Sequence, residues 1–104
     1  MAKTEIESGV CGFTTEVEAK MEGDECILTI HSGCKNIQHL AEELTSVDPF
    51  QEITFRGSGP KTLKLAAKFC QHTACPVPAG IIKAVEVAAG LALPKDASIK
   101  VMPE

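Results

Sequence analysis

The chain has 104 residues, of which 44% are hydrophobic and 23% charged, and its 14 acidic and 10 basic side chains give a net charge of −4. This length and apolar content suit one domain over residues 1–104 with a core of its own. The negative charge and the lack of Trp and Tyr argue against nucleic acid and an anionic membrane as partners, because both require basic surface. No apolar run approaches the roughly 18 residues of a membrane span. The charged, alternating start is unlike a secretory signal, so we expect a cytoplasmic protein.

Three strands are expected in the first third of the chain. Residues 4–10 and 15–21 alternate between the two faces of a strand, with charged residues mainly on one of them, which is the period of a half-buried strand. Residues 26–31 are interpreted as a third strand that carries Leu28 and Ile30 on one face. A tight-turn sequence, Glu-Gly-Asp-Glu at residues 22–25, joins the second and third strands. These two strands are therefore predicted to form a hairpin.

The pattern of this hairpin also predicts its register. A two-residue turn pairs Met21 with Cys26 and makes every core-facing residue of one strand oppose a core-facing residue of the other. The same register, extended away from the turn, places Phe13 opposite Cys34 and Cys11 diagonal to Cys34. Diagonal neighbours lie roughly 7–8 Å apart, a span that one metal ion can bridge. Cys11 and Cys34 are thus expected to lie together at the far end of the hairpin.

The rest of the chain predicts helices with two further strands. Apolar residues at helical spacing indicate helices over residues 35–45 and 61–71 and a third that begins near residues 76–78. Short strands are predicted at residues 53–56 and 97–101. Residues 57–62 lack the spacing of a phosphate-binding loop and are interpreted as a turn. The order β-β-β-α-(β)-α-α-β indicates an α+β fold, with helices on one face of a mostly antiparallel sheet.

The five cysteines are the unusual feature of the composition: Cys11, Cys26, Cys34, Cys70 and Cys75. In a reducing compartment thiols stay free, so they serve metal binding, redox chemistry or plain packing. Cys26 lies on the core face of its strand and is interpreted as a packing residue. Cys34 and Cys75 each precede a predicted helix, where the helix dipole and free N–H groups favour a thiolate.

Two further candidate ligands come from the end of the second predicted helix. Cys70 and His72 are separated from Cys75 by four and two residues, and both spacings allow chelation. Cys70 also continues the apolar stripe of its helix, so packing is the alternative for that residue. A site of Cys11, Cys34 and Cys75 with Cys70 or His72 suits zinc or an iron–sulfur cluster, because these are soft or borderline ligands.

Three short cysteine motifs carry a family resemblance: Gly-Val-Cys at residues 9–11, Ser-Gly-Cys at 32–34 and Thr-Ala-Cys-Pro at 73–76. In this order they resemble the motifs of the zinc-binding TSCPD domain, which is found alone and at the ends of some ribonucleotide reductases. The resemblance extends to about residue 89. It implies zinc ligation by Cys11, Cys34 and Cys75, with Cys70 as the cysteine that the family has shortly before the last motif.

The same layout is similar to NifU-like iron–sulfur cluster scaffolds. There, cysteines before a hairpin, at a strand-to-helix junction and before a late helix hold a cluster or zinc with a nearby histidine. Cys11, Cys34 and Cys75 fit the three cysteine positions, and His72 lies two residues from the histidine position. With its Ala-Gly-Leu-Ala-Leu-Pro-Lys-Asp segment at residues 89–96, the whole chain also resembles small prokaryotic proteins of unknown function.

The sequence therefore predicts a small metal-binding domain with a zinc site of three cysteines plus Cys70 or His72. We expect a structural or accessory module rather than an enzyme, with an unidentified protein partner as a possibility. The alternatives are an iron–sulfur scaffold or carrier, a thiol redox or sulfur-transfer protein that uses Cys75, and a metal-free interaction domain.

Overall fold

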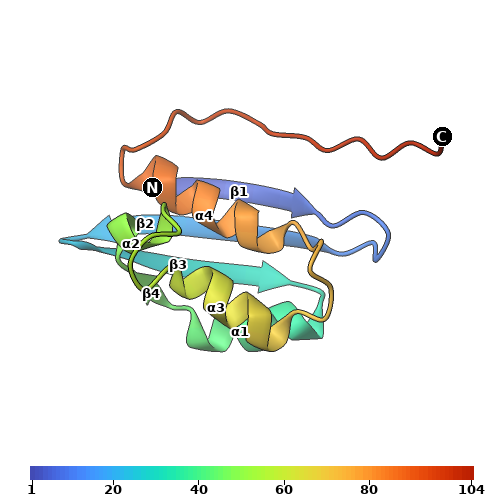
Figure 1. The fold of residues 1–104 in the computed structure, drawn as a ribbon. Helices are drawn as coiled ribbons and strands as arrows, with labels where there is room; N and C mark the ends of the chain where they lie inside the picture. The colour runs from blue at the N-terminus through green and yellow to red at the C-terminus, as the bar shows by residue number, and fades with distance from the viewer.

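A computed structural model describes all 104 residues. Its single sheet is antiparallel and has the order β1-β2-β3-β4 (Figure 1). The strands are β1 (Ala2–Glu7), β2 (Thr14–Glu22), β3 (Glu25–Ser32) and the two-residue β4 (Ser46–Val47).

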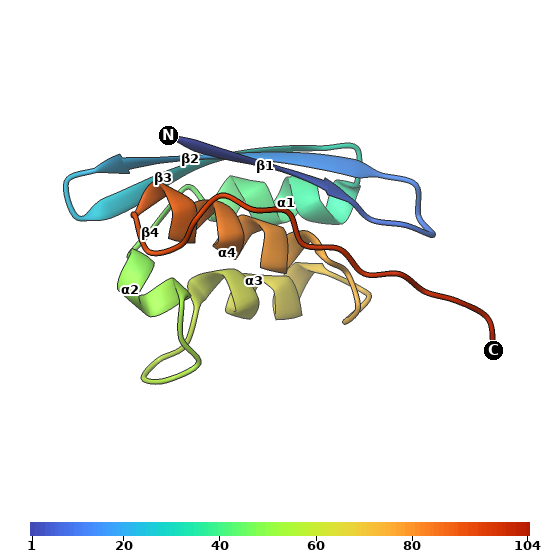
Figure 2. The ribbon, with the colours of Figure 1, turned by 90° about the horizontal axis from the view of Figure 1, so that it is seen from above.

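All four helices lie on one face of this sheet, as Figure 2 shows. They are α1 (Lys35–Glu43), α2 (Pro49–Glu52), α3 (Lys61–Phe69) and α4 (Val77–Ala88). α4 packs against β1 and β2, and α1 packs against β3, while α3 lies on α1 and α4. The predicted α+β fold, with helices on one face of an antiparallel sheet, is confirmed. No helix has the length and apolar content needed to cross a bilayer.

The predicted hairpin register is confirmed residue by residue. Met21 pairs with Cys26 and Val17 with Ile30, and the β2–β3 ladder ends at the pair Thr15–Ser32. A register slip of one residue would turn this whole apolar set toward solvent, so burial of one face fixes the pairing.

The core lies between the inner face of the sheet and the two helices that touch it. Its buried apolar members are Ile6, Val17, Ala19, Cys26, Leu28, Ile37, Leu40, Leu44, Val47, Val77, Ile81, Ala84 and Val85. Cys26 is 0% exposed, which agrees with its interpretation as a packing residue.

The prediction of a strand at residues 53–56 is wrong. The fourth strand instead lies earlier, at Ser46–Val47, and pairs with Cys26 and Ile27. Asp48 then caps the short helix α2 by accepting a hydrogen bond from the Phe50 N–H at 3.0 Å. Pro49 occupies the first helical position, where its fixed φ favours a helix. The capping residue and the proline thus start a helical turn that strand periodicity did not reveal.

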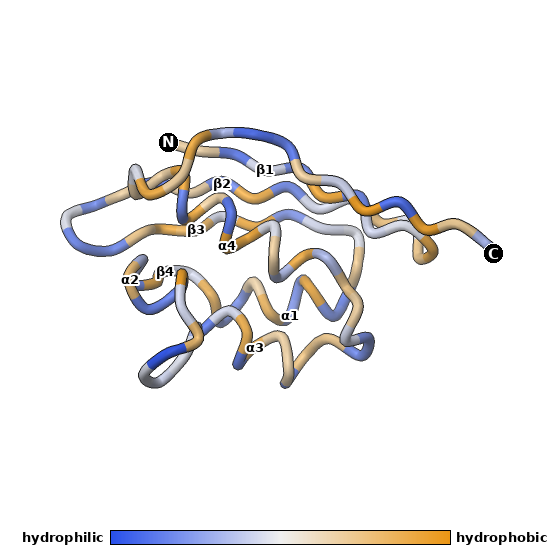
Figure 3. The backbone as a smooth tube through the Cα atoms, turned by 45° about the horizontal axis from the view of Figure 1, so that its top comes forward, coloured by the Kyte–Doolittle hydropathy of each residue, from blue (hydrophilic) through white to orange (hydrophobic).

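The strand predicted at residues 97–101 does not form. Gly90 has a φ of +73° and turns the chain back at the end of α4, where the Leu91 N–H donates to the Glu86 carbonyl at 2.8 Å. The tail, residues 91–104, is extended and exposed along its whole length. In Figure 3 apolar and polar colours alternate toward its end. A strand requires a neighbour for its backbone hydrogen bonds, and in the single chain the tail has none.

Candidate functional site

Three half-buried cysteines approach one another from three separate places in the chain. Cys34 is the N-cap of α1, Cys70 is the C-cap of α3, and Cys75 lies two residues before α4. All three pack against the hydrophobic core. Figure 1 shows the β3–α1 junction and the α3–α4 connection at the same end of the sheet. We call these three side chains the thiol cluster.

The local chain conformation explains how Cys70 and Cys75 come together. Cys70 adopts an extended conformation that ends α3, while its N–H still donates to the Ala66 carbonyl at 2.8 Å. A turn follows, in which the Cys75 N–H donates to the His72 carbonyl at 3.2 Å. Pro76 then precedes α4, and a proline is tolerated there because the first helical N–H groups have no partner in the helix. The turn therefore folds Cys75 back toward Cys70.

Cys34 is held by a small polar network at the end of β3. Its N–H donates to the Ser32 hydroxyl at 3.1 Å, and the Thr15 hydroxyl donates to the same oxygen at 2.8 Å. The Gln38 side chain donates to the Ser32 carbonyl at 2.8 Å. The Cys34 side chain itself makes no capping hydrogen bond. Its sulfur thus stands at the start of α1 without a capping role and is available as a ligand.

Within the thiol cluster, Cys70 has a raised pKa. The pKa of the Cys70 thiol is raised to about 11, mainly by burial and in addition by the charge of the neighbouring Cys75 and a side-chain hydrogen bond with it. The charge of Cys34 adds a smaller increase. Cys70 therefore holds its proton at neutral pH in the metal-free protein, and the sulfurs are close enough to repel one another once they ionise.

This raised pKa predicts slow alkylation of Cys70 in the metal-free protein. Two pKa units mean on the order of a hundredfold less thiolate near pH 8 than for an ordinary thiol, and only the thiolate reacts. Because the folded pKa lies above the ordinary thiol value of 9.0, this group also contributes stability that is present below pH 9 and lost as pH rises toward 11. Mass-spectrometric mapping of iodoacetamide labelling and urea unfolding from pH 8 to 11 test both effects.

Alanine at Cys75 is the matched control for this prediction. It removes the charge and the hydrogen bond of the neighbour but leaves Cys70 half-buried, so labelling of Cys70 should become faster without reaching the rate in the unfolded chain. Labelling of Cys70 at the unfolded rate in the native protein would contradict the burial argument.

The remaining two predicted ligands, Cys11 and His72, lie outside the thiol cluster. Cys11 is exposed in the turn between β1 and β2, where the Gly12 N–H donates to the Gly9 carbonyl at 2.9 Å. The side chain of His72 is also exposed. The β2–β3 ladder stops before the register reaches Phe13, so the turn carries Cys11 into solvent. In this arrangement of side chains, no three Cys, His, Asp or Glu residues form a group that can hold a metal ion.

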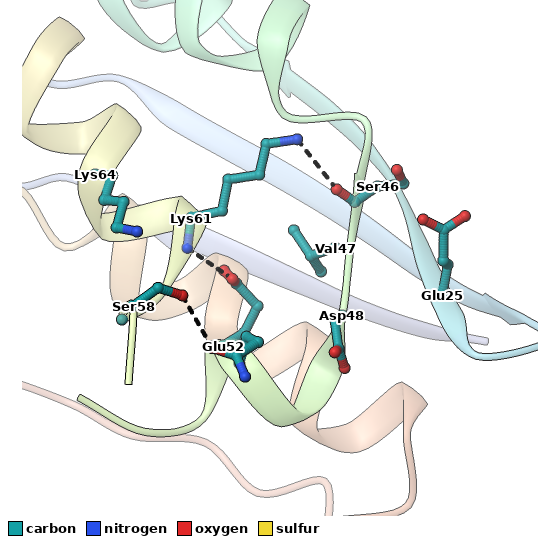
Figure 4. Close-up of a pocket in the computed structure, with 10 residues that line it drawn as sticks. Glu25, Ser46, Val47, Asp48, Glu52, Ser58, Lys61 and Lys64 are labelled. Atoms are coloured by element: carbon teal, nitrogen blue, oxygen red, sulfur yellow. Dashed lines mark hydrogen bonds between the residues drawn. The ribbon is translucent and has the colours of Figure 1, made fainter. Parts of the chain in front are cut away.

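A polar pocket of about 320 Å³ lies elsewhere, between β4, α2 and the start of α3 (Figure 4). Glu52 at its floor is only 2% exposed. The carboxylate accepts hydrogen bonds from the N–H of Lys61 at 2.7 Å and of Thr62 at 3.0 Å, and from the Thr62 hydroxyl. It thus occupies the N-terminus of α3, the position at which a phosphate would otherwise bind. Residues 57–58 form the predicted turn, while residues 61–62 begin α3.

Sequence reasoning missed Glu52 altogether. The available signal was indirect: α3 begins after Pro60, which has no side chain that can cap the helix. A helix without a local cap requires an acceptor from elsewhere. The identity of that acceptor depends on the fold of α2, which was not predicted.

Comparisons with known proteins give a family but no activity. No curated protein matches the chain. No solved structure matches it either. A family of unknown function, DUF6951, matches residues 2–101, and the chain belongs to this family.

Proposed function

We propose that the thiol cluster binds one zinc ion and that this site links the start of α1 to the end of α3 and to the start of α4. The observation that carries the proposal is the approach of Cys34, Cys70 and Cys75 from three separate elements, close enough that the sulfurs of Cys34 and Cys75 both act on the pKa of Cys70. Three partly exposed thiols from distant positions are typical of a soft or borderline metal site.

Binding requires a modest rearrangement of side chains. Zinc coordinates thiolate sulfur at about 2.3 Å, so the ion would draw the three sulfurs closer together by rotation about their χ1 bonds and displace their protons. The half-exposed position of the cluster leaves an approach for the ion. Cys11 or His72, both exposed at present, would supply the fourth ligand by moving toward the ion.

The proposed role is structural or accessory. Cys34 begins α1, Cys70 ends α3, and Cys75 leads into α4, so one ion held by all three would link these helices. Metal binding then contributes directly to folding free energy, because the unfolded chain has no preformed site.

The test is the zinc content of cysteine variants. We expect one zinc per chain in protein isolated without oxygen, and a loss of zinc affinity of at least tenfold in each of Cys34→Ser, Cys70→Ser and Cys75→Ser. Cys26→Ala is the matched control, because Cys26 is buried in the core away from the cluster; it should lower stability and keep one zinc. Elemental analysis and competition with a chromophoric chelator measure these quantities.

The same series of variants identifies the fourth ligand and includes the results that would rule out the proposal. A loss of affinity in Cys11→Ser or in His72→Ala, but not in both, identifies that ligand. Full zinc content in any two of the three cluster variants would rule out the site. A brown, iron-containing protein would instead support the iron–sulfur alternative.

The contact between Cys70 and Cys75 favours a second candidate, a dithiol–disulfide couple. Oxidation by a low-molecular-weight disulfide would form one S–S bond, and the two thiols would pass two electrons and two protons to the oxidant, which becomes two thiols. The oxidised protein would be lighter by two hydrogens and would label only at the other three cysteines. A metal-free protein that shows this change, reversible with a dithiol reductant, would favour the redox function over zinc.

A further inference from the structure

The tail, residues 91–104, carries several large apolar side chains, yet all of its residues are exposed to solvent. Leu93, Ile99, Val101 and Met102 are between 77% and 90% exposed. Residues 92–104 make no hydrogen bond within the chain. Several large apolar side chains exposed within one short segment are a feature of interaction sites.

Its sequence pattern specifies the kind of interaction. Ala97, Ile99 and Val101 alternate with the polar residues Ser98 and Lys100. This two-residue period gives one apolar and one polar face to an extended chain, as in a strand that covers a core on one side only. The tail therefore has the pattern of a strand that lacks its neighbour.

The sheet offers an open edge at β1. β1 pairs only with β2, and the Ser8 N–H just beyond it donates to the Phe13 carbonyl at 3.0 Å. Because hydrogen bonding alternates along an antiparallel pair, the even-numbered residues of β1 face β2 with their N–H groups. The N–H groups of Lys3, Glu5 and Glu7 consequently point outward and are available to another strand.

We propose that two copies of this chain exchange their tails, so that residues 97–101 of each copy add a strand to the open edge of β1 in the other. The tail does not reach this edge in its own chain, because it turns at Gly90 and runs back beside α4 in the helical layer rather than in the plane of the sheet (Figures 1 and 2). Exchange between two identical chains forms a closed, symmetric dimer, and addition of a strand satisfies the free edge groups.

Charge complementarity supports a second copy as the occupant. With Ile99 and Val101 on the core side, Lys100 would lie on the outer face of the sheet, the face on which β1 carries Glu5 and Glu7. The only basic side chain of β1, Lys3, is already paired with Glu16 at 3.3 Å. The added strand thus supplies a positive charge where the outer face is acidic.

The test compares the oligomeric state of the intact chain with that of a tail variant, its matched control and an edge variant. Light scattering after size-exclusion chromatography should give a dimer for the wild-type chain. Ile99→Glu combined with Val101→Glu places charges on the face that becomes buried and should give a monomer. Ser98→Lys is the matched control, since it adds charge to the same segment on the outward face, and it should remain dimeric.

An edge variant, Glu5→Pro, tests the open edge of β1. Glu5→Pro removes one outward N–H and none of the bonds between β1 and β2, and proline is tolerated on the open side of an edge strand. It should be monomeric with an unchanged circular dichroism spectrum. In hydrogen exchange, amides of residues 97–101 and of Glu5 should be protected in the wild-type dimer and lose protection in the tail variant.

Three results would overturn this inference. They are a wild-type chain that is monomeric with an unprotected tail, a monomer in which residues 97–101 are protected by pairing within the same chain, and a dimer that persists in the tail variant. Each is independent of zinc content, so failure here leaves the proposed metal site unaffected.

Discussion

Replacing Glu52 by alanine is expected to lower the free energy of unfolding by about 3–5 kcal/mol. The carboxylate is buried and accepts hydrogen bonds from two N–H groups at the start of α3 and from the Thr62 hydroxyl. Alanine leaves the buried N–H and hydroxyl of Thr62 and the part-buried N–H of Lys61 without a partner, and each unsatisfied buried group costs about 1–3 kcal/mol. Urea unfolding, followed by far-UV circular dichroism, measures the change.

Two further variants calibrate this result. Asp48→Ala removes an exposed cap of α2 that accepts one hydrogen bond and should lower stability by only about 1 kcal/mol. Glu52→Gln keeps one acceptor oxygen but turns an amide donor toward the helix N–H groups, so its effect should lie between the two. An effect of Glu52→Ala no larger than that of Asp48→Ala would contradict the role of Glu52 as the cap of α3.

Alanine at Gly80 is expected to destabilise the protein by about 2–3 kcal/mol, although alanine is the better helix former. A Cβ at this position would stand 2.5 Å from Ile6 Cδ1 and closer still to its Cγ1. The backbone of α4 is held at this distance because the Thr4 hydroxyl donates to the Gly80 carbonyl at 2.9 Å. Gly80 therefore permits the close approach of α4 to β1, and thermal or urea unfolding measures its loss.

A double-mutant cycle separates the steric effect from helix propensity. Ile6→Ala removes both clashing carbons and leaves the Ile6 Cβ position at an ordinary contact distance of 3.7 Å. In that background Gly80→Ala should become neutral or stabilising by up to about 1 kcal/mol. If the effects of the two substitutions on the free energy of unfolding are additive, the close contact with Ile6 is not the reason for glycine at this position.

Most of the sheet could be predicted from the sequence because one of its faces is buried. Alternation in β2 and β3, together with the two-residue turn, determined the pairing of Met21 with Cys26 and of Val17 with Ile30. α1, α3 and α4 were likewise expected from apolar spacing, although α3 ends earlier than predicted, at Phe69. The errors, at residues 53–56 and 97–101, concern short segments whose state depends on a cap or on a neighbouring strand rather than on periodicity.

The candidate site could be predicted only in part. The positions of Cys34 and Cys75 before helices follow from local signals, and Cys70 lies where the end of α3 was expected. The prediction that Cys11 lies beside Cys34 is wrong, because it extends a ladder that ends at Thr15 and Ser32. Sequence spacing defines a register within a hairpin but not the point at which the hairpin opens into a turn.

X-ray absorption at the zinc edge of the zinc-loaded chain tests the central claim most directly. The account predicts three sulfur neighbours at about 2.3 Å, or four if Cys11 moves in, with any fourth ligand of another type at about 2.0–2.1 Å. The sulfur count should fall by one in Cys70→Ser and stay unchanged in Cys26→Ala. A zinc ion surrounded mainly by nitrogen and oxygen would show that the thiol cluster does not hold the metal.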